Sequence, residues 1–176
     1  VTKPLVASAV WVALEEEGLD LDQPAGPEGS TVRHLLAHAS GLGLDGVEIA
    51  RPGRRRIYSN TGFEVLGATL EAASGISTAG YLDEAVLTPL GMASTSPDGS
   101  PAHAATSTVA DLVRWVGELL QPALLAPETV ALATSVAFPG LDGLVPGYGK
   151  QSPNDWGLGV EVRGHKSPHW TAPGNS

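Results

Sequence analysis

The strongest constraint on the fold is that apolar residues recur at helical spacing in one segment after another over most of the chain. In the first segment Leu5, Ala9 and Val12 form one stripe, and Gly18 follows as a stop signal. The best strand candidate is Trp156–Val162, so we expect a mostly helical chain that reaches a sheet only near its end. The pattern predicts helices over residues 1–17, 31–39, 62–74, 78–87, 109–120 and 127–134.

Composition narrows the class of protein. The chain has 176 residues, of which 42% are hydrophobic, and it contains no cysteine. This is enough apolar material for a core without disulfide bonds, and a thiolate metal site is impossible. The net charge of -9 argues against nucleic acid or an anionic membrane as the main partner. No metal or organic cofactor is indicated and the compartment stays undecided, so the expected partner is a small molecule.

Both ends of the chain look internal to a larger domain. Val1 opens directly on an apolar run, and the residues from Thr171 to Ser176 have a loop-like composition. We therefore expect residues 1–176 to form one partial domain, with a further part upstream and the closing strands downstream.

Two patterns that can mark functional sites are expected to be structural. His34 and His38 share a helix face as zinc-binding pairs do, but a His-Glu-x-x-His pattern and a third ligand are absent. A solvated loop is the expectation for four clustered arginines, Arg51, Arg54, Arg55 and Arg56. The sequence also lacks a Gly-x-Ser-x-Gly elbow and a P-loop, which argues against an α/β-hydrolase and a nucleotide enzyme.

Lys3 is the first candidate for chemistry. It stands in the first turn of the first predicted helix, where the helix dipole disfavours a positive charge. An isolated lysine there is ordinarily exposed, with its stem along the helix end. The alternative is a base, because a serine just before Val1 would lie one turn away on the same face. A desolvated ammonium gives up its proton more easily and can then activate such a serine.

Tyr58 and Asn60 follow the arginine-rich loop and precede a predicted helix. Asn60 can simply cap that helix, and Tyr58 can pack its ring in the core. As a catalytic pair, a phenol near a lysine relays a proton and an amide holds a substrate carbonyl. A Tyr-x-Asn tripeptide is too common by chance to decide between these interpretations.

Several segments, in the right order, resemble the class C β-lactamases and related penicillin-binding serine hydrolases. Val1–Lys3 looks like the end of a Ser-x-x-Lys motif without its serine, and Tyr58–Asn60 resembles the Tyr-x-Asn motif. The remaining similar segments are the Leu-Leu-x-His-x-Ser-Gly-Leu pattern within Val32–Leu42, the turn Pro89–Met92, the helix start Ser107–Leu112 and the segment Trp156–Gly159.

The resemblance implies an α+β fold of the β-lactamase/transpeptidase type, of which this chain supplies mainly the helical region and the beginning of the mixed sheet. It also implies a catalytic set in which the missing serine forms an acyl-enzyme and Lys3 takes the serine proton. Tyr58 would assist that transfer and protonate the leaving nitrogen, while Asn60 would bind the substrate amide or stay close to Lys3.

The sequence departs from the family pattern in two places. The third motif, His- or Lys-x-Gly, is not found, since His165-Lys-Ser does not fit it, and we expect it beyond Ser176. The loop between Leu42 and Tyr58 is short, which predicts an open site. A β-lactamase is therefore the first expectation, an esterase, D-aminopeptidase or D,D-peptidase the second, and a non-catalytic penicillin-binding-like module the third.

Overall fold

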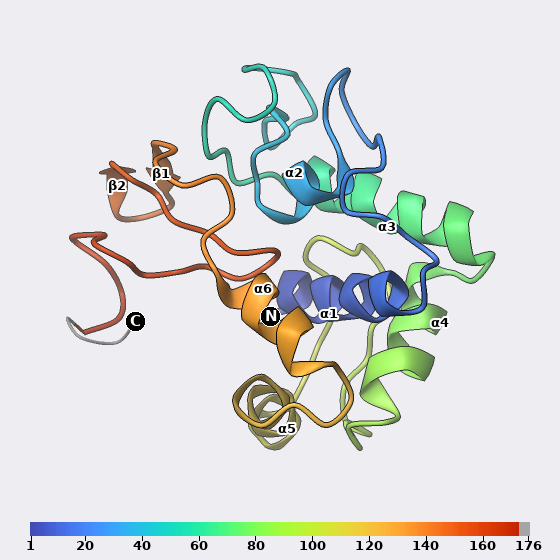
Figure 1. The fold of residues 1–176 in the computed structure, drawn as a ribbon. Helices are drawn as coiled ribbons and strands as arrows, with labels where there is room; N and C mark the ends of the chain where they lie inside the picture. Colours follow the sequence, from blue (N-terminus) through green and yellow to red (C-terminus); the bar gives the residue numbers. More distant parts are fainter. Residues whose placement is uncertain (173–176) are drawn as a thin grey trace.

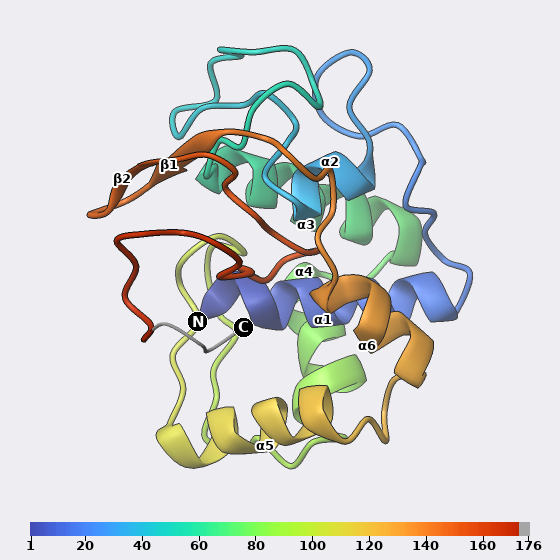
Figure 2. The same cartoon turned by 60° about the vertical axis from the view of Figure 1, so that its left-hand side comes forward.

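The computed structural model describes residues 1–172, and in it the other helices surround a central helix, α1 (Thr2–Glu15). The helices α3, α4 and α6 all pack against α1, which runs through the middle of the molecule in both ribbon views (Figures 1 and 2). Apolar residues lie all round α1, as burial on every side requires. The remaining helices are α2 (Val32–Leu36), α3 (Asn60–Ser74), α4 (Thr78–Leu82), α5 (Val109–Leu120) and α6 (Pro127–Thr134).

The predicted helices are all present; α5 and α6 have the predicted ends, and the ends of the others are shifted. The segment predicted over residues 78–87 begins as α4 and continues as the π-helical turn η1 (Asp83–Leu87), where the Thr88 N–H donates to the Asp83 carbonyl at 2.9 Å. The segment predicted over 31–39 is helical only in α2, and His38 has a φ of 53°. None of the described helices is long and apolar enough to cross a membrane.

The strand predicted at Trp156–Val162 is wrong. This segment is a tight turn, closed by a bridge between Trp156 and Glu161. Gly159 has a φ of 101°, and a Cβ there would lie 2.2 Å from the Ala7 Cβ, so the turn packs directly against α1. The alternation of apolar residues and glycines suggested a strand, but the glycines instead allow the turn to pack closely against its neighbours.

The described strands lie instead in the Gly/Pro-rich stretch that precedes this segment. They are β1 (Gly143–Val145) and β2 (Gly149–Gln151), which pair antiparallel with Leu144 opposite Lys150. The chain is thus mainly helical with a short two-stranded sheet near its end, in agreement with the α+β expectation.

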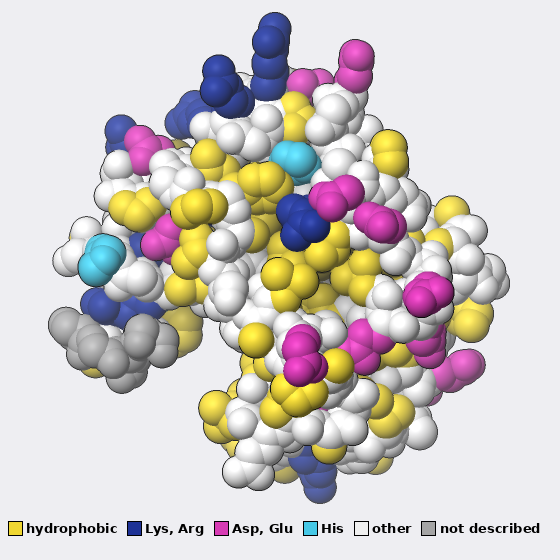
Figure 3. All heavy atoms as spheres, in the orientation of Figure 1, with side chains coloured by type: hydrophobic (Ala, Val, Ile, Leu, Met, Phe, Trp, Pro, Cys, Tyr) yellow, Lys and Arg dark blue, Asp and Glu magenta, His cyan; other side chains and the backbone are white. Residues whose placement is uncertain are grey.

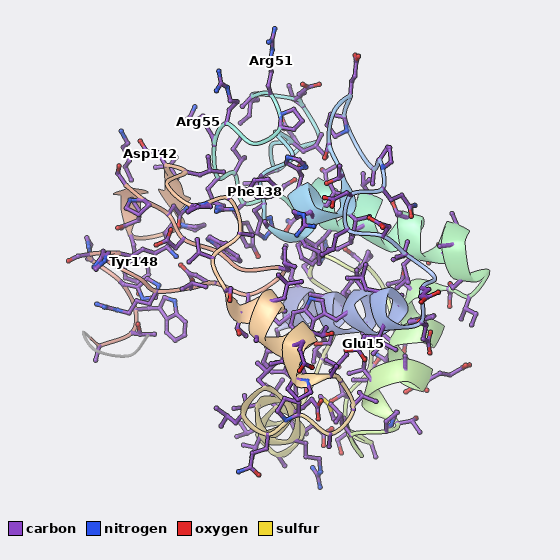
Figure 4. The ribbon with its side chains drawn as sticks, in the orientation of Figure 1. Glu15, Arg51, Arg55, Phe138, Asp142 and Tyr148 are labelled. Carbon is purple, nitrogen blue, oxygen red and sulfur yellow. The ribbon has the colours of Figure 1, made fainter. Side chains whose placement is uncertain are left out.

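The arginine loop is solvated only in part. Arg51, Arg54 and Arg55 are exposed, and Figure 4 shows Arg51 and Arg55 projecting outward. Arg56, in contrast, is only 2% exposed, which corrects the expectation of a wholly solvated cluster. Its guanidinium donates to four backbone carbonyls, those of Ala37, Ala137, Phe138 and Asn154.

These carbonyls belong to three segments that are far apart in sequence, so Arg56 ties the end of α2, the segment after α6 and the segment after β2 together. A charge run in a sequence does not distinguish an arginine whose donors are satisfied by buried carbonyls from its solvated neighbours. The consequence is that the backbone leading to Tyr58 is fixed in the core.

We expect Arg56→Ala to lower the free energy of unfolding of the intact protein by about 3 kcal/mol, because it leaves buried carbonyls without donors. Arg54→Ala, which removes the same charge from an exposed position in the same loop, should change it by less than about 0.5 kcal/mol. Urea unfolding followed by tryptophan fluorescence measures both. Equal effects of the two substitutions would contradict the structural role of Arg56.

Candidate active site

Lys3 lies buried at the start of α1, with its ammonium group held by two oxygen atoms. Its Nζ donates to Asn60 Oδ1 at 2.6 Å and to the Ala102 carbonyl at 2.8 Å. The same Nζ lies 4.3 Å from the centre of the Tyr58 ring, within the range of a cation–π contact. The side chain is therefore not the exposed lysine of a helix end, since only 5% of the residue is accessible.

The backbone before α3 explains why Asn60 is free to face Lys3. The helix is capped by Ser59, whose hydroxyl accepts from the Gly62 N–H at 2.9 Å and donates to the Gly43 carbonyl. Asn60 is the first helical residue and does not act as the cap. The structure thus brings together Lys3, Tyr58 and Asn60, the three residues that the sequence singled out.

The electrostatics of this cluster favour a lysine that can lose its proton. Burial lowers the pKa of Lys3 to about 8, and the nearby Glu64 carboxylate opposes this shift. Both hydrogen-bond partners of Lys3 are neutral oxygens, so they satisfy its donors without adding a full negative charge. Burial raises the pKa of the Tyr58 phenol, which keeps that group protonated at neutral pH.

His38 supports the site from behind. Its ring contacts those of Tyr58, Phe63 and Trp156, with centroids 4.7, 5.2 and 4.8 Å away. Its Nδ1 accepts from the Ser59 N–H at 3.2 Å, which places the proton of the neutral ring on Nε2. Burial, together with the charges of Lys3 and Arg56, lowers the pKa of His38 to about 3.

His34 is separate from this cluster. Its Nδ1 lies 2.9 Å from Thr31 Oγ1, and its ring stacks on Phe138. In the described part of the chain, no group of three or more acidic or histidine side chains is arranged to hold a metal. The contacts of both histidines agree with the structural roles expected for them.

Lys3, Tyr58 and Asn60 line one side of a cleft of about 870 Å³. Three tryptophans, Trp115, Trp156 and Trp170, line it as well. The surface is indented between the C-terminal segment and α5 in the space-filling view (Figure 3). The cleft therefore sets a small polar cluster against a largely apolar wall, as small-molecule sites commonly do.

The sequence did not identify two parts of this site. The Ala102 carbonyl is a backbone group, so no residue type could have marked it. Glu161 also lines the cleft, and Lys166 lies beside it, with Nζ 3.3 Å from Glu161 Oε1 and bonded to the carbonyls of Asp155 and Val162. A buried lysine next to a predicted strand carries no pattern that distinguishes it from an exposed one.

Comparisons with known proteins agree on one family. The family model described as beta-lactamase matches residues 1–174. A crystal structure of a beta-lactamase from Mycobacterium bovis is 57% identical, with a TM-score of 0.97 over 99% of this chain and 66% of that one.

Two more distant proteins extend the comparison. Penicillin-binding protein 4* of Bacillus subtilis is 31% identical over 126 residues, covering 52% of this chain and 28% of that protein. A D-stereospecific amidohydrolase from a Streptomyces species is 20% identical, covers 90% of this chain and 68% of its own, and shares the fold with a TM-score of 0.67. The chain thus spans less than two thirds of the length of the Mycobacterium and Bacillus relatives.

The pKa of His38 predicts a pH-dependent stability. Since the folded pKa is about 3 and the ordinary value is 6.5, the unfolded chain binds a proton below pH 6.5 that the folded protein does not. As the pH decreases from 6.5 toward 3, His38 should therefore lower the free energy of unfolding by up to about 1.4 kcal/mol per pH unit.

His38→Gln should reduce that slope, whereas His103→Gln, at an exposed position, should leave it unchanged. Urea unfolding at a series of pH values measures the difference between variants. A slope in His38→Gln equal to that of the wild type would contradict the buried neutral state of His38.

Proposed function

The chain belongs to the beta-lactamase family, a family of serine hydrolases with the β-lactamase/transpeptidase-like fold, and on this premise we propose that the intact protein hydrolyses β-lactams through an acyl-enzyme. The observation that supports this most is the buried ammonium of Lys3, bonded to Asn60 Oδ1 at 2.6 Å beside the Tyr58 ring and open to the cleft. Lysines of lowered pKa that line a substrate-sized cleft are typical of functional sites.

The proposed nucleophile is a serine immediately before Val1. A residue there lies three positions before Lys3, one helical turn away, so its hydroxyl can face the Lys3 amine. In its neutral form Lys3 accepts the serine proton while the serine oxygen attacks the lactam carbonyl carbon. The carbon–nitrogen bond then breaks, the leaving nitrogen takes a proton delivered through Tyr58, and an ester links the serine to the acyl group. Water hydrolyses that ester and restores the serine.

Asn60 has two tasks in this scheme. Its Oδ1 holds the Lys3 ammonium, which fixes the direction of the lysine side chain. Its amide NH₂ remains available as a donor to a substrate carbonyl. Tyr58 stays protonated because burial raises its pKa, so it can supply a proton to the leaving group when Lys3 replaces that proton.

Small esters and D-amino-acid peptides are the second class of substrate. The observation that favours them is the cleft wall, in which tryptophans from three parts of the chain offer apolar surface for an acyl or leaving group. The same nucleophile and base serve all of these substrates, because each reaction passes through an ester on the serine. A non-catalytic binding module is the third alternative.

Incubation of the intact protein with a fluorescent penicillin, followed by mass spectrometry, tests the proposal. An adduct on the peptide that ends in Val1-Thr-Lys3 would support a penicillin-reactive serine, and rapid turnover would identify a lactamase. Hydrolysis of a simple ester without any penicillin adduct would favour the second class of substrate. Failure of both reactions would favour the binding module.

We expect Lys3→Ala and Tyr58→Phe, each made in the intact protein, to lower the acylation rate by about a thousandfold, since each removes a group that moves a proton. The matched controls are Lys150→Ala and Tyr148→Phe, which make related changes at positions outside the cleft lining. Stopped-flow burst kinetics measures acylation directly. A wild-type rate in either Lys3→Ala or Tyr58→Phe would refute its assigned role.

A further inference from the structure

One acidic residue close to the cluster has no part in the scheme above. Glu64 lies on α3 four residues after Asn60, so the two side chains emerge from one face of the helix. Glu64 is exposed and is not part of the cleft lining, so it does not meet a substrate there. Its carboxylate nevertheless acts on the charge of Lys3, whose pKa it raises against the effect of burial.

A continuous set of hydrogen bonds joins Glu64 to Lys3. The Ser100 hydroxyl donates to Glu64 Oε1 and also accepts from the Ala102 N–H at 3.0 Å. The carbonyl of the same Ala102 accepts from Lys3 Nζ at 2.8 Å. Ser100 therefore lies between the carboxylate and the one backbone residue that Lys3 contacts.

A second contact seats this segment on α3. A Cβ on Gly67 would lie 2.9 Å from Pro101 Cγ, so only a glycine lets the segment approach the helix so closely. On its other side the segment is tied to α1, where Thr2 Oγ1 accepts from the Ala105 N–H at 3.0 Å. The loop over residues 100–105 thus bridges α3 and the start of α1.

We propose that Glu64, acting through Ser100, is a positioning residue for Lys3. Through Ser100, Glu64 holds the Ala102 carbonyl against the lysine, and the Glu64 charge favours the protonated lysine. The role of Lys3 as base comes from the proposed function, and this inference rests on it. Glu64 opposes the lowering of the Lys3 pKa by desolvation, so the lysine remains a base of useful strength.

The other titratable groups around Lys3 do not share this arrangement. His38 lies behind the cluster and Tyr58 within it, and the pKa of each is shifted toward the neutral form. His103 and Glu161 line the same cleft but make no hydrogen bond to Lys3. Glu64 is the acidic group that raises the pKa of Lys3.

The test uses Glu64→Gln in the intact protein, since the amide oxygen can still accept from Ser100 while the charge is lost. The pKa of Lys3 should fall, and the acidic limb of the kcat/KM profile should move down by roughly half a pH unit. The shift should shrink in 1 M salt, because exposed charges are screened. The control is Glu84→Gln, which removes the same charge from an exposed residue on η1.

A second pair of variants tests the path through Ser100. Ser100→Ala should lower the plateau of kcat/KM by about tenfold, because the Ala102 carbonyl is no longer held in place. Ser100→Thr, which keeps the hydroxyl, should recover most of it. A loss of thermal stability in Ser100→Ala without any change in the plateau would overturn the positioning role.

An NMR titration of the intact protein, labelled with ¹³C-lysine and assigned with Lys3→Arg, measures the pKa of Lys3. It therefore tests the effect of Glu64 on Lys3 without any catalysis. A lower Lys3 pKa in Glu64→Gln but not in Glu84→Gln supports the inference even if no acyl-enzyme forms, in which case only the proposed function fails. An unchanged Lys3 titration and an unmoved acidic limb in an enzyme that does form the acyl-enzyme overturn the inference and leave the function intact.

Discussion

Burial of one ammonium group at the start of α1 is the constraint on which the site depends. A cation removed from water costs several kcal/mol unless its donors are satisfied. Lys3 meets this requirement with an amide oxygen from α3 and a carbonyl from the loop over residues 100–105. Three parts of the chain must therefore meet at one atom, and α1, the most buried helix, carries that atom to the edge of the cleft.

The loops around this atom are held in the same way. Arg56 satisfies its guanidinium with carbonyls from three segments, and its position two residues before Tyr58 fixes the path of that residue. Lys166 binds two carbonyls in the segment that carries Trp156. Backbone carbonyls in irregular segments lack the hydrogen-bond donors that helices and sheets supply. Where regular structure ends, a buried arginine or lysine side chain can donate these hydrogen bonds instead.

Local patterns predicted more of the fold than of the site. The helices follow from apolar residues at helical spacing, and the ends of α5 and α6 agree with the prediction because Thr108 and Pro127 mark their starts. The turn at Trp156 was predicted as a strand, because Gly157 and Gly159, which allow close contact with Ala133 and Ala7, leave an alternating pattern. The roles of the three candidate site residues were predicted from the resemblance to a family, whereas the contact of Lys3 with the Ala102 carbonyl depends on tertiary structure and has no sequence signal.

The kind of partner separates the two buried lysines of this region. Burial lowers the pKa of Lys166 as it lowers that of Lys3, but the Glu161 carboxylate, 3.3 Å from Lys166 Nζ, opposes the shift by direct contact. Lys3 has only neutral oxygens in contact, and its acidic neighbour, Glu64, acts through an intervening serine. A carboxylate in direct contact opposes the effect of desolvation on the pKa of a lysine, whereas neutral acceptors satisfy its donors without adding this opposition. Asparagine and a backbone carbonyl thus satisfy Lys3 without a negative charge in direct contact, and this difference in partners distinguishes it from Lys166 although burial lowers the pKa of both.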